Sequence, residues 1–371
     1  MIVGIDAHAV GGRSSGNETY YEQLVKHLAD STAGGISYLV YYTHAVGATK
    51  IPVSEKIRIK RIRPSWPMVR IPCSFPLEFR REKVDVFHAQ FIVPPFCKCK
   101  AVTTIPDIAY EHFPELFSSF ETVRSKILIR RSAKLADHII TVSKYSKDDL
   151  VRTYDIDPHK ITVTYGAASP VFRPRDSDSC KEQIHQKYGI DAPFFLYVGR
   201  LQARKNLPRL LRAFARLNSE GVKEKLVVVG KRDWMLESVA EQVKGLKLQQ
   251  SVVFTGYVPS EDLPLFYGGA EVFLYPSIFE GFGLPVMEAM ASGTPVMTSF
   301  GSSLEEIAGD AALLVDPYSE ESIANGLRRL VSDAGLRALL RVNGLRRSSA
   351  FSYEQTAQRT IDVYKNVVGA L

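Results

Sequence analysis

Two carboxylates, Glu280 and Glu288, stand eight positions apart around a glycine-bearing turn, and no other residues of this chain are better placed to do chemistry. The turn reads Gly281-Phe282-Gly283. Before it, Val272–Tyr275 is a short continuous apolar run, which predicts a buried parallel strand. After it, Pro285 suits a first helical position, because its ring fixes φ and its missing N–H costs nothing there. The sequence therefore predicts a strand, a glycine turn and a helix in direct succession.

Such a succession forms an anion site, because free backbone N–H groups and the positive end of the helix dipole point to one spot. We expect the N–H groups of Phe282, Gly283 and Leu284 to bind phosphate oxygens, with Gly281 and Gly283 allowing close approach. The two carboxylates would repel a phosphate, so they should face something neutral and rich in hydroxyl groups. A nucleotide sugar has both parts, since its diphosphate lies between two polyols.

Cations follow a second predicted strand, at residues 195–198. Gly199 and Arg200 come directly after it, and Lys205 lies five positions further on. Ligands of open α/β sheets bind at the carboxyl ends of strands, and cations there can neutralise a leaving diphosphate. We expect Arg204, in contrast, to face solvent.

Three motifs in this order resemble those of the retaining family-4 glycosyltransferases, which have the two-domain GT-B fold. They are the Glu-x7-Glu segment, the stretch Leu-Tyr-Val-Gly-Arg-Leu-Gln-Ala-Arg-Lys-Asn-Leu at 196–207, and Phe-Thr-Gly-Tyr-Val at 254–258. The similarity extends from about residue 194 to about residue 316, with weaker similarity from about 6 to about 172. A lone glycine-rich turn would be far less specific than three motifs in the family's order and spacing.

The resemblance implies a role for each residue. Arg200 and Lys205 neutralise the departing diphosphate, Glu280 contacts hydroxyl groups of the donor sugar, and Glu288 holds the ribose. The implied catalytic residues are Glu280, Arg200, Lys205 and Asp107, and the implied nucleotide-sugar-binding residues are Gly12, Gly199, Gly281, Phe282, Gly283, Leu284 and Glu288.

The N-terminal half resembles the family less closely. A glycine loop at 11–16, which includes Gly12, follows the first strand and would meet the diphosphate and the acceptor, although a plain flexible turn explains the same residues. Many relatives have a His-Asp pair after the fifth strand, whereas this chain has Pro106-Asp107. His88 and Ser143 also follow strands and could line the site, or His88 could be a hydrogen-bonded core residue.

Apolar runs alternate with amphipathic stretches throughout the chain, which predicts the βαβ rhythm of doubly wound parallel sheets. Expected strands lie at 2–5, 38–42, 57–62, 84–88, 101–105, 139–142 and 161–164, and then at 195–198, 226–229, 252–255, 272–275, 295–298 and 312–315. The 371 residues exceed the usual size of one hydrophobic core. The expected fold class is therefore α/β, with two Rossmann-like doubly wound domains that, by the GT-B resemblance, face a central cleft.

We expect an N-terminal acceptor domain at 1–170 and a C-terminal nucleotide-sugar domain at 171–352. A last helix, about 353–371, would pack back on the first domain. The segment 166–191, rich in Pro, Ser and Asp, is expected to be the linker. It contains Asp176-Ser177-Asp178, a sequence that metal-dependent transferases use, but its place in a linker favours a solvated segment, and we expect no metal site.

Composition limits the function classes. A hydrophobic fraction of 45% fits a soluble globular protein, and no apolar run approaches the roughly 18 residues of a membrane span. The N-terminus lacks the basic region of a signal peptide. Four cysteines make no disulfide framework for a chain of this size, so we expect reduced thiols and a cytoplasmic protein. Cys97 and Cys99 could form half of a metal site, but no second half is evident.

The net charge of +7 belongs to the N-terminal half. Residues 1–175 contain 25 Lys and Arg against 17 Asp and Glu, while the remainder is nearly balanced at 22 against 23. This excess fits either a solvated face or attraction to anionic lipid or a lipid-diphosphate acceptor at the inner face of a membrane. No motif typical of nucleic-acid recognition accompanies it, so nucleic acid is not an expected partner.

The sequence therefore predicts a retaining glycosyltransferase. It would move a hexose from a nucleoside-diphosphate sugar to a glycan or lipid-linked acceptor in cell-surface polysaccharide synthesis, with GDP-mannose favoured and no cofactor or metal required. UDP-glucose or UDP-N-acetylglucosamine as donor, and a non-catalytic nucleotide-sugar-binding protein, remain alternatives. A dinucleotide oxidoreductase is disfavoured because no Gly-x-Gly-x-x-Gly follows a strand.

Overall fold

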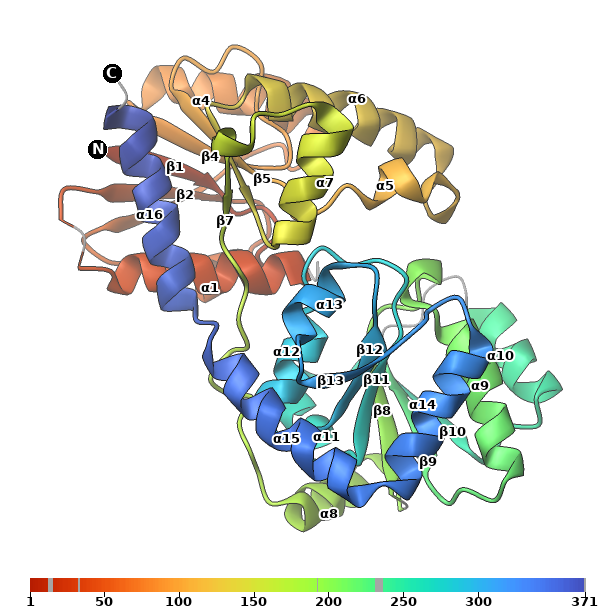
Figure 1. Ribbon diagram of the computed structural model, residues 1–371. Helices are drawn as coiled ribbons and strands as arrows, with labels where there is room; N and C mark the ends of the chain where they lie inside the picture. Colours follow the sequence, from red (N-terminus) through yellow and green to blue (C-terminus); the bar gives the residue numbers. More distant parts are fainter. Residues whose placement is uncertain (13–15, 33, 192, 231–235, 370–371) are drawn as a thin grey trace. The chain divides into compact units, whose positions relative to one another are not determined.

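The structure is a computed structural model that describes residues 1–12, 16–32, 34–191, 193–230 and 236–369 (Figure 1). The chain divides into two compact units. Unit 1 comprises Met1–Gly166 and Ser352–Leu371, and unit 2 comprises Ala167–Phe351. In each unit a parallel sheet carries helices on both sides, which is the α/β class and the doubly wound architecture that the sequence predicts.

Unit 1 is built on a seven-stranded sheet with the order β3-β2-β1-β4-β5-β6-β7. Its strands are β1 (Ile2–Asp6), β2 (Ser37–Tyr42), β3 (Ile57–Arg61), β4 (Val86–Gln90), β5 (Lys100–Thr104), β6 (His138–Thr141) and β7 (Ile161–Val163). Its helices are α1 (Gly16–Asp30), α2 (Gly47–Lys50), α3 (Pro67–Val69), η1 (Arg70–Ser74), α4 (Phe75–Arg81), α5 (Ala109–His112), η2 (Pro114–Leu116), α6 (Ser119–Leu135), α7 (Lys144–Tyr154), η3 (Pro158–Lys160) and α16 (Tyr353–Gly369).

The last helix, α16, packs on the sheet of unit 1 through a buried histidine. His88 in β4 is fully buried, and its two ring nitrogens lie 2.6 Å from Tyr364 Oη and 2.6 Å from Thr104 Oγ1. Burial lowers the pKa of His88 to about 3, so the ring is neutral. Of the two roles open from the sequence, His88 therefore has that of a hydrogen-bonded core residue.

Unit 2 is built on a six-stranded sheet with the order β10-β9-β8-β11-β12-β13. Its strands are β8 (Phe194–Val198), β9 (Lys225–Val229), β10 (Val252–Gly256), β11 (Val272–Tyr275), β12 (Val296–Ser299) and β13 (Ala312–Val315). Its helices are α8 (Ser177–Tyr188), η4 (Ala203–Lys205), α9 (Leu207–Ser219), α10 (Leu236–Gly245), α11 (Leu263–Gly269), α12 (Leu284–Ala291), α13 (Ser303–Ala308), α14 (Glu320–Ser332) and α15 (Ala334–Ser349).

Hydrophobic spacing accounts for these elements. All thirteen predicted strands are present, with their ends displaced by at most two residues. In α9 the large buried residues recur at three- and four-residue intervals, which gives the helix one apolar face. They are Leu207, Leu210, Leu211, Phe214 and Leu217. Within the described residues, no helix is both long enough and apolar enough to cross a membrane.

The predicted linker is wrong over much of its length. Residues 177–188 form helix α8, which belongs to unit 2 and buries Cys180 and Ile184. Asp176 begins the helix, since its side chain accepts a hydrogen bond from the Ser179 N–H at 2.8 Å. Of the Asp and Ser residues that suggested a linker, Asp176 is the helix cap and the next three form the first turn of the helix. Asp176 and Asp178 are exposed, as the sequence predicts. The break between the units falls earlier, at Gly166.

Candidate active site

The predicted residues of unit 2 lie on loops that leave two neighbouring strands. β8 and β11 pair in parallel, and the strand order of the sheet reverses between them, since β9 lies beyond β8 and β12 lies beyond β11. Ligands of open α/β sheets bind outside the carboxyl ends of the strands at such a reversal. The segments 199–206 and 276–283 leave the sheet at this point, so they are the expected place for a ligand.

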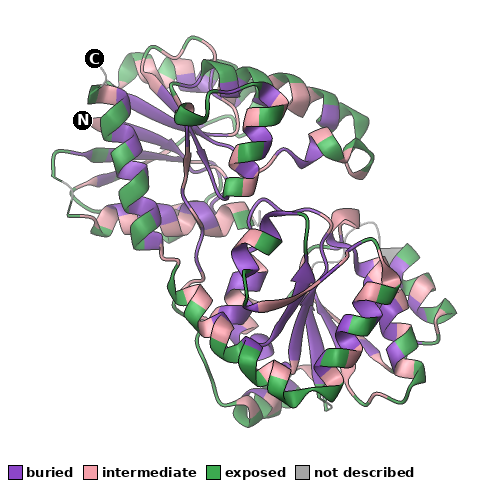
Figure 2. Ribbon diagram, viewed as in Figure 1, coloured by how far each residue is buried: buried purple, intermediate pink, exposed green. Residues whose placement is uncertain are grey.

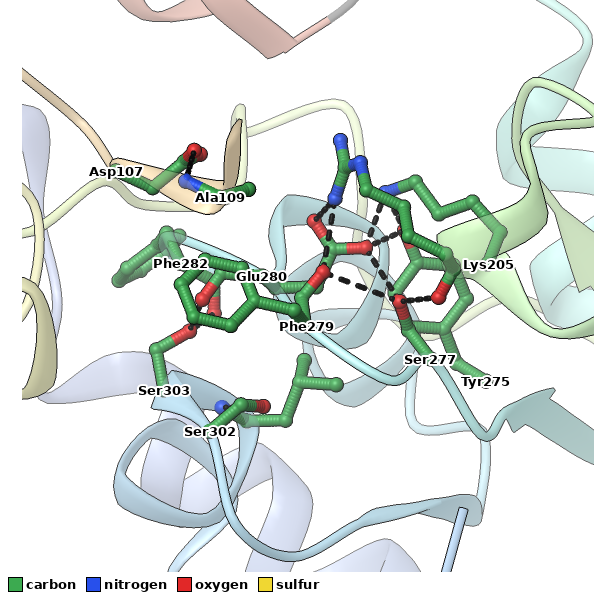
Figure 3. A network of polar contacts seen from close by, with 12 residues as sticks. Asp107, Ala109, Lys205, Tyr275, Ser277, Phe279, Glu280, Phe282, Ser302 and Ser303 are labelled. Carbon is green, nitrogen blue, oxygen red and sulfur yellow. Dashed lines mark hydrogen bonds and ion pairs between the residues drawn. The ribbon is translucent and has the colours of Figure 1, made fainter. Parts of the chain in front are cut away.

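The Glu280 carboxylate lies at the centre of a buried polar cluster, in which Lys205, Tyr275 and Ser277 surround it (Figure 3). Glu280 is 6% exposed. Its Oε1 accepts hydrogen bonds from Ser277 Oγ at 2.9 Å and Tyr275 Oη at 3.0 Å, and pairs with Lys205 Nζ. Its Oε2 accepts from Arg204 Nη1 at 2.9 Å. Protein donors therefore hold both oxygens, and two of the four donors are cations.

The cations keep this carboxylate ionised. Burial alone would raise the pKa of the Glu280 carboxyl, but the charges and hydrogen bonds of Arg204 and Lys205 outweigh burial and hold the pKa at about 2. Lys205 is 8% exposed, and its Nζ donates to Tyr275 Oη at 2.5 Å and lies 5.1 Å from the centre of that ring. Two cations and one anion give the cluster a net positive charge, which suits a diphosphate.

Backbone contacts fix the two loops to each other. Asn206 has a φ of 64°, in the left-handed region that asparagine tolerates better than most residues. Its buried Nδ2 donates to the carbonyl oxygen of Pro276 at 2.9 Å. Ile278 N donates to the carbonyl oxygen of Arg204 at 2.8 Å, and Ser277 Oγ lies 2.9 Å from the same oxygen. The relative position of the loops therefore does not depend on the ion pairs alone.

The prediction that Arg204 faces solvent is wrong. Its side chain is 21% exposed, and Nη1 donates to the carbonyl oxygen of Phe279 at 2.9 Å in addition to Glu280. The reason is local geometry. Arg204 and Lys205 lie in the 3₁₀ turn η4, where adjacent side chains point in different directions, so the two cations reach the carboxylate at different oxygens.

The glycine turn ends at Gly283, whose φ of +104° is a conformation that other residues rarely adopt. A Cβ at this position would lie 2.5 Å from Leu304 Cδ2. Helix α12 begins at Leu284, one residue before the proline that the sequence places first. Ser303 Oγ donates to the carbonyl oxygen of Glu280 at 2.7 Å, which ties the start of the turn to α13.

Gly281 and Phe282 complete the turn, and both are buried. The Phe282 ring meets the Phe351 ring edge-on, with centroids 6.2 Å apart, and the carbonyl oxygen of Phe282 lies 3.3 Å from Ser303 Oγ. Phe351 and Ser303 therefore hold the part of the turn that precedes Gly283.

Glu288 lies on α12, and its hydrogen-bond partner is not one of the residues that surround Glu280. It accepts a hydrogen bond from Tyr267 Oη at 2.9 Å. Burial raises the pKa of Glu288 to about 7, and the Tyr267 hydrogen bond opposes this only in part. The two glutamates of the motif thus differ in kind: one is a firmly ionised anion, and the other changes charge near neutral pH.

Gly199 and Arg200 lie at the carboxyl end of β8. The Gly199 N–H donates to the carbonyl oxygen of Val229 at 2.9 Å, which extends the ladder between β8 and β9 by one residue. A Cβ at Gly230 would lie 2.0 Å from the carbonyl oxygen of Gly199, so the backbone that follows β9 approaches the end of β8 closely. The Arg200 side chain is exposed at the start of the loop, whereas Lys205 is buried in the cluster.

In unit 1 the predicted glycine loop is only partly described. Gly11 has a φ of +78°, and a Cβ there would lie 2.4 Å from Gly47 N, so glycine is required for close backbone approach. The Gly12 N–H donates to the carbonyl oxygen of Ala9 at 3.0 Å. Residues 13–15 of the loop lie outside the described residues.

Asp107 and Ser143 take part in local turns. Asp107 is half-buried after β5, and its Oδ1 accepts the Ala109 N–H at 3.1 Å. Ser143 is buried at the start of α7, where its Oγ accepts the Ser146 N–H at 3.0 Å. Both side chains therefore shape the carboxyl edge of the unit 1 sheet.

Sequence reasoning missed a charged cluster at the end of β1. Asp6 is 2% exposed, with Oδ1 3.0 Å from His8 Nδ1 and Oδ2 3.7 Å from Arg70 Nη2. Burial would raise the pKa of Asp6, but His8 and Arg70 lower it below the usual range. β1 and β4 are neighbours where the strand order of unit 1 reverses, so Asp6 lies at the second ligand-binding position of the fold.

Comparison with known proteins agrees with this geometry. A family model described as "Glycosyl transferases group 1" matches residues 180–347, and one described as "Glycosyltransferase Family 4" matches residues 14–170. The chain is 33% identical over 288 residues to O-antigen chain mannosyltransferase B of Escherichia coli, which covers 77% of this chain and 75% of that protein. The chain belongs to the group 1 and family 4 glycosyltransferases.

A second relative and two solved structures extend the comparison. The glycosyltransferase is 31% identical to O-antigen chain mannosyltransferase RfbU of Salmonella typhimurium, over 61% of this chain and 60% of that one. Sucrose-phosphate synthase of Thermosynechococcus elongatus superposes with a TM-score of 0.81 at 20% identity, covering 100% of both chains. HepE of Anabaena, solved with UDP-glucose, gives 0.77 at 18% identity, covering 99% and 100%. At these identities the solved structures establish the GT-B fold.

The glycosyltransferase motifs identified the loops but not every residue of the cluster. Tyr275 is the last residue of the apolar strand β11, and Ser277 follows it by two positions. Polar side chains at the end of an apolar strand can themselves indicate a ligand site, but the motifs predicted a role only for the neighbouring Glu280. Tyr267, the partner of Glu288, lies on α11 and has no motif to mark it.

Proposed function

We propose that this glycosyltransferase moves a mannosyl group from a nucleoside-diphosphate donor, GDP-mannose in the first place, to a glycan or lipid-linked saccharide in cell-surface polysaccharide synthesis. Retention at the anomeric carbon and independence of metal are part of the proposal. The names of the relatives, two of them O-antigen chain mannosyltransferases, support mannose as the sugar. We also propose that the enzyme works in the cytoplasm, at the inner face of a membrane.

One observation carries the donor assignment: buried Lys205 and Glu280 form a cluster with half-buried Arg204 at the strand-order reversal of unit 2. Its net positive charge complements a diphosphate, and the N-terminus of α12 beside it adds the positive end of a helix dipole. A leaving diphosphate gains negative charge as the sugar departs. Fixed cations in a buried site stabilise that charge, which supports catalysis without a metal.

The hydrogen bonding of Glu280 bears on the mechanism. Its two oxygens accept from four donors, and its pKa is about 2, so it is a poor nucleophile. We therefore favour a front-face reaction over a covalent intermediate. The bond between the anomeric carbon and the phosphate oxygen breaks, the acceptor oxygen bonds to the same face of that carbon, and the leaving diphosphate takes the acceptor's proton.

Two alternatives remain. HepE, which has the same fold, was solved with UDP-glucose, so a UDP-linked donor is the first alternative. A non-catalytic nucleotide-sugar-binding protein would use the same cationic cluster without turnover.

Donor turnover separates these functions. Purified protein is incubated with GDP-mannose, UDP-glucose or UDP-N-acetylglucosamine together with an alkyl mannoside as acceptor. Release of the nucleotide is followed by chromatography, and the configuration of the new glycosidic bond is read from its anomeric proton by NMR. We expect GDP release from GDP-mannose and a product of retained configuration. Lys205→Ala should reduce kcat by about 100- to 1,000-fold, the usual loss for a group that stabilises transition-state charge. Lys187→Ala is the control, because Lys187 is exposed and pairs with Asp262 on the surface.

Two results would contradict the proposal. Turnover only with a UDP-linked donor would exclude GDP-mannose. Nucleotide binding without release from any donor would favour the non-catalytic alternative.

A further inference from the structure

Helix α6, Ser119–Leu135, has two faces that both carry apolar residues. The inner face buries Thr122, Ile129, Ser132 and Ala133 against unit 1. A capping box between Ser118 and Glu121 stabilises the N-terminus, and Ser132 Oγ accepts the N–H of Val93 at 2.8 Å. The helix is therefore held in place without help from its outer side chains.

The outer face carries an exposed apolar stripe. Phe120 is 65% exposed, Val123 57% and Ile127 62%. Their spacing of three and four residues places them on one side of the helix, opposite the buried residues. Figure 2 shows exposed residues along most of α6. Single exposed apolar residues are normal on a protein surface, but three on one face of a helix form a patch of the kind that marks an interaction site.

Cations continue this face toward the C-terminal end of the helix. α6 contains one acid, Glu121, and five cations: Arg124, Lys126, Arg130, Arg131 and Lys134. By the helical period, Arg124, Arg131 and Lys134 share the side of Phe120 and Ile127. Arg131 and Lys134 are exposed, whereas Lys126 pairs with Glu111 at 3.2 Å and the Arg130 guanidinium lies 5.8 Å from the Tyr154 ring.

From this arrangement we propose that the outer face of α6 is the surface by which the enzyme binds an anionic lipid bilayer. Apolar side chains enter the interface between head groups and acyl chains, while Arg131 and Lys134 meet the phosphates of the head groups. The inference rests on the proposed function only in that a lipid-linked acceptor would explain why an enzyme of this fold needs a membrane.

The charge of the outer face of α6 favours an anionic bilayer over a second copy of the chain as its binding partner. A second copy of the chain laid on the same face would bring like charges together, because the two helices would present the same cations. An anionic bilayer offers both the apolar layer and the opposite charge. The exposed cations of α6 are attracted to the negative bilayer surface within about one Debye length, beyond which salt screens the attraction.

The test uses the full-length protein and two kinds of vesicle, one of phosphatidylcholine and the other with phosphatidylglycerol added. Binding is measured by sedimentation over a range of salt concentrations. We expect the parent to bind the acidic vesicles and to release them as salt rises. Replacing two cations, Arg131→Gln with Lys134→Gln, should weaken binding about 25-fold at low salt, or about fivefold for each cation.

The apolar part is tested separately. Val123→Ser with Ile127→Ser should weaken binding roughly tenfold or more, since apolar area no longer leaves water. Leu339→Ser with Val342→Ser is the matched control, because these residues of α15 are 56% and 64% exposed and lie in unit 2. Lys223→Gln with Lys244→Gln, both exposed in unit 2, controls for loss of charge.

Three outcomes would overturn the inference. They are equal binding of the parent to neutral and acidic vesicles, losses in the α6 variants no larger than in their controls, and a parent dimer in light scattering that Val123→Ser with Ile127→Ser dissociates. The last would assign the face to a contact between copies. GDP release without vesicles tests the proposed function independently, and the α6 variants should retain it.

Discussion

The Glu280 cluster makes a sharp prediction for the substitution Glu280→Gln. Glutamine keeps the size and shape of the side chain but cannot carry the negative charge. Arg204 and Lys205 would then remain beside a neutral group, and Lys205 is 8% exposed. A buried cation without its counter-ion is costly, so unit 2 should be destabilised.

The size of the effect follows from the pKa. The pKa of Glu280 falls from an ordinary value of 4.5 to about 2 in the folded protein. A difference of about 2.5 units corresponds to roughly 3 kcal/mol of stability at neutral pH. For a unit the size of Ala167–Phe351 this is a fall in Tm of about 6–12 °C.

The sign of the pH dependence is also determined. A carboxyl whose pKa is lowered by folding contributes stability above the unfolded pKa, and this contribution is lost as pH falls toward the folded pKa. At pH 3 roughly 2 kcal/mol of it should be gone. The difference in stability between the parent and Glu280→Gln should therefore shrink from about 3 kcal/mol at pH 7 to about 1 kcal/mol at pH 3.

Differential scanning calorimetry at the two pH values measures this, and steady-state kinetics measures catalysis. Glu220→Gln is the control, because Glu220 pairs with Arg328 on an exposed surface and its loss should leave Tm unchanged. Glu280→Ala should reduce kcat by about 10- to 150-fold if the residue also contacts the reacting sugar.

Two results would refute this reasoning. An unchanged Tm for Glu280→Gln at pH 7 would mean that the carboxylate is not needed to neutralise its two cations. A kcat for Glu280→Ala within about twofold of the parent would remove Glu280 from the reacting sugar.

Four further predictions concern Glu288, the metal requirement and the core of unit 1. Glu288→Ala should mainly raise the donor KM, because a ribose contact is the same in ground and transition states, and a change confined to kcat would contradict this role. Burial raises the pKa of Glu288 to about 7, so the donor KM of the parent should fall from pH 6 to pH 8, whereas that of Glu288→Gln should stay level. Activity should survive EDTA, and a loss that Mg²⁺ or Mn²⁺ restores would refute metal independence. Tyr364→Phe leaves a buried nitrogen of His88 without its partner, so unit 1 should lose about 1–3 kcal/mol, and an unchanged Tm would show that this contact is dispensable.

Local features of the sequence were sufficient for the fold. The strand Val272–Tyr275 was predicted with its observed ends, because four apolar residues before a turn leave little choice of conformation. The same is true of the glycine turn, where Gly283 takes a φ that other residues rarely adopt. Even the failure at α8 was local, since Asp and Ser serve both in loops and at the start of helices.

The sequence by itself therefore determined the two sheets, the order of their strands along the chain, the loops that carry Lys205 and Glu280, and the helix that carries Glu288. Only the tertiary structure decided which side chains meet. Arg204 and Glu280 are 76 positions apart in the chain, yet they share an ion pair because β8 and β11 are neighbours at the reversal of strand order. Periodicity along a chain reports which face of an element is buried, but an ion pair depends on the direction of two side chains brought together from separate strands. The low pKa of Glu280 and the high pKa of Glu288 arise from those meetings and from burial, which no local pattern contains.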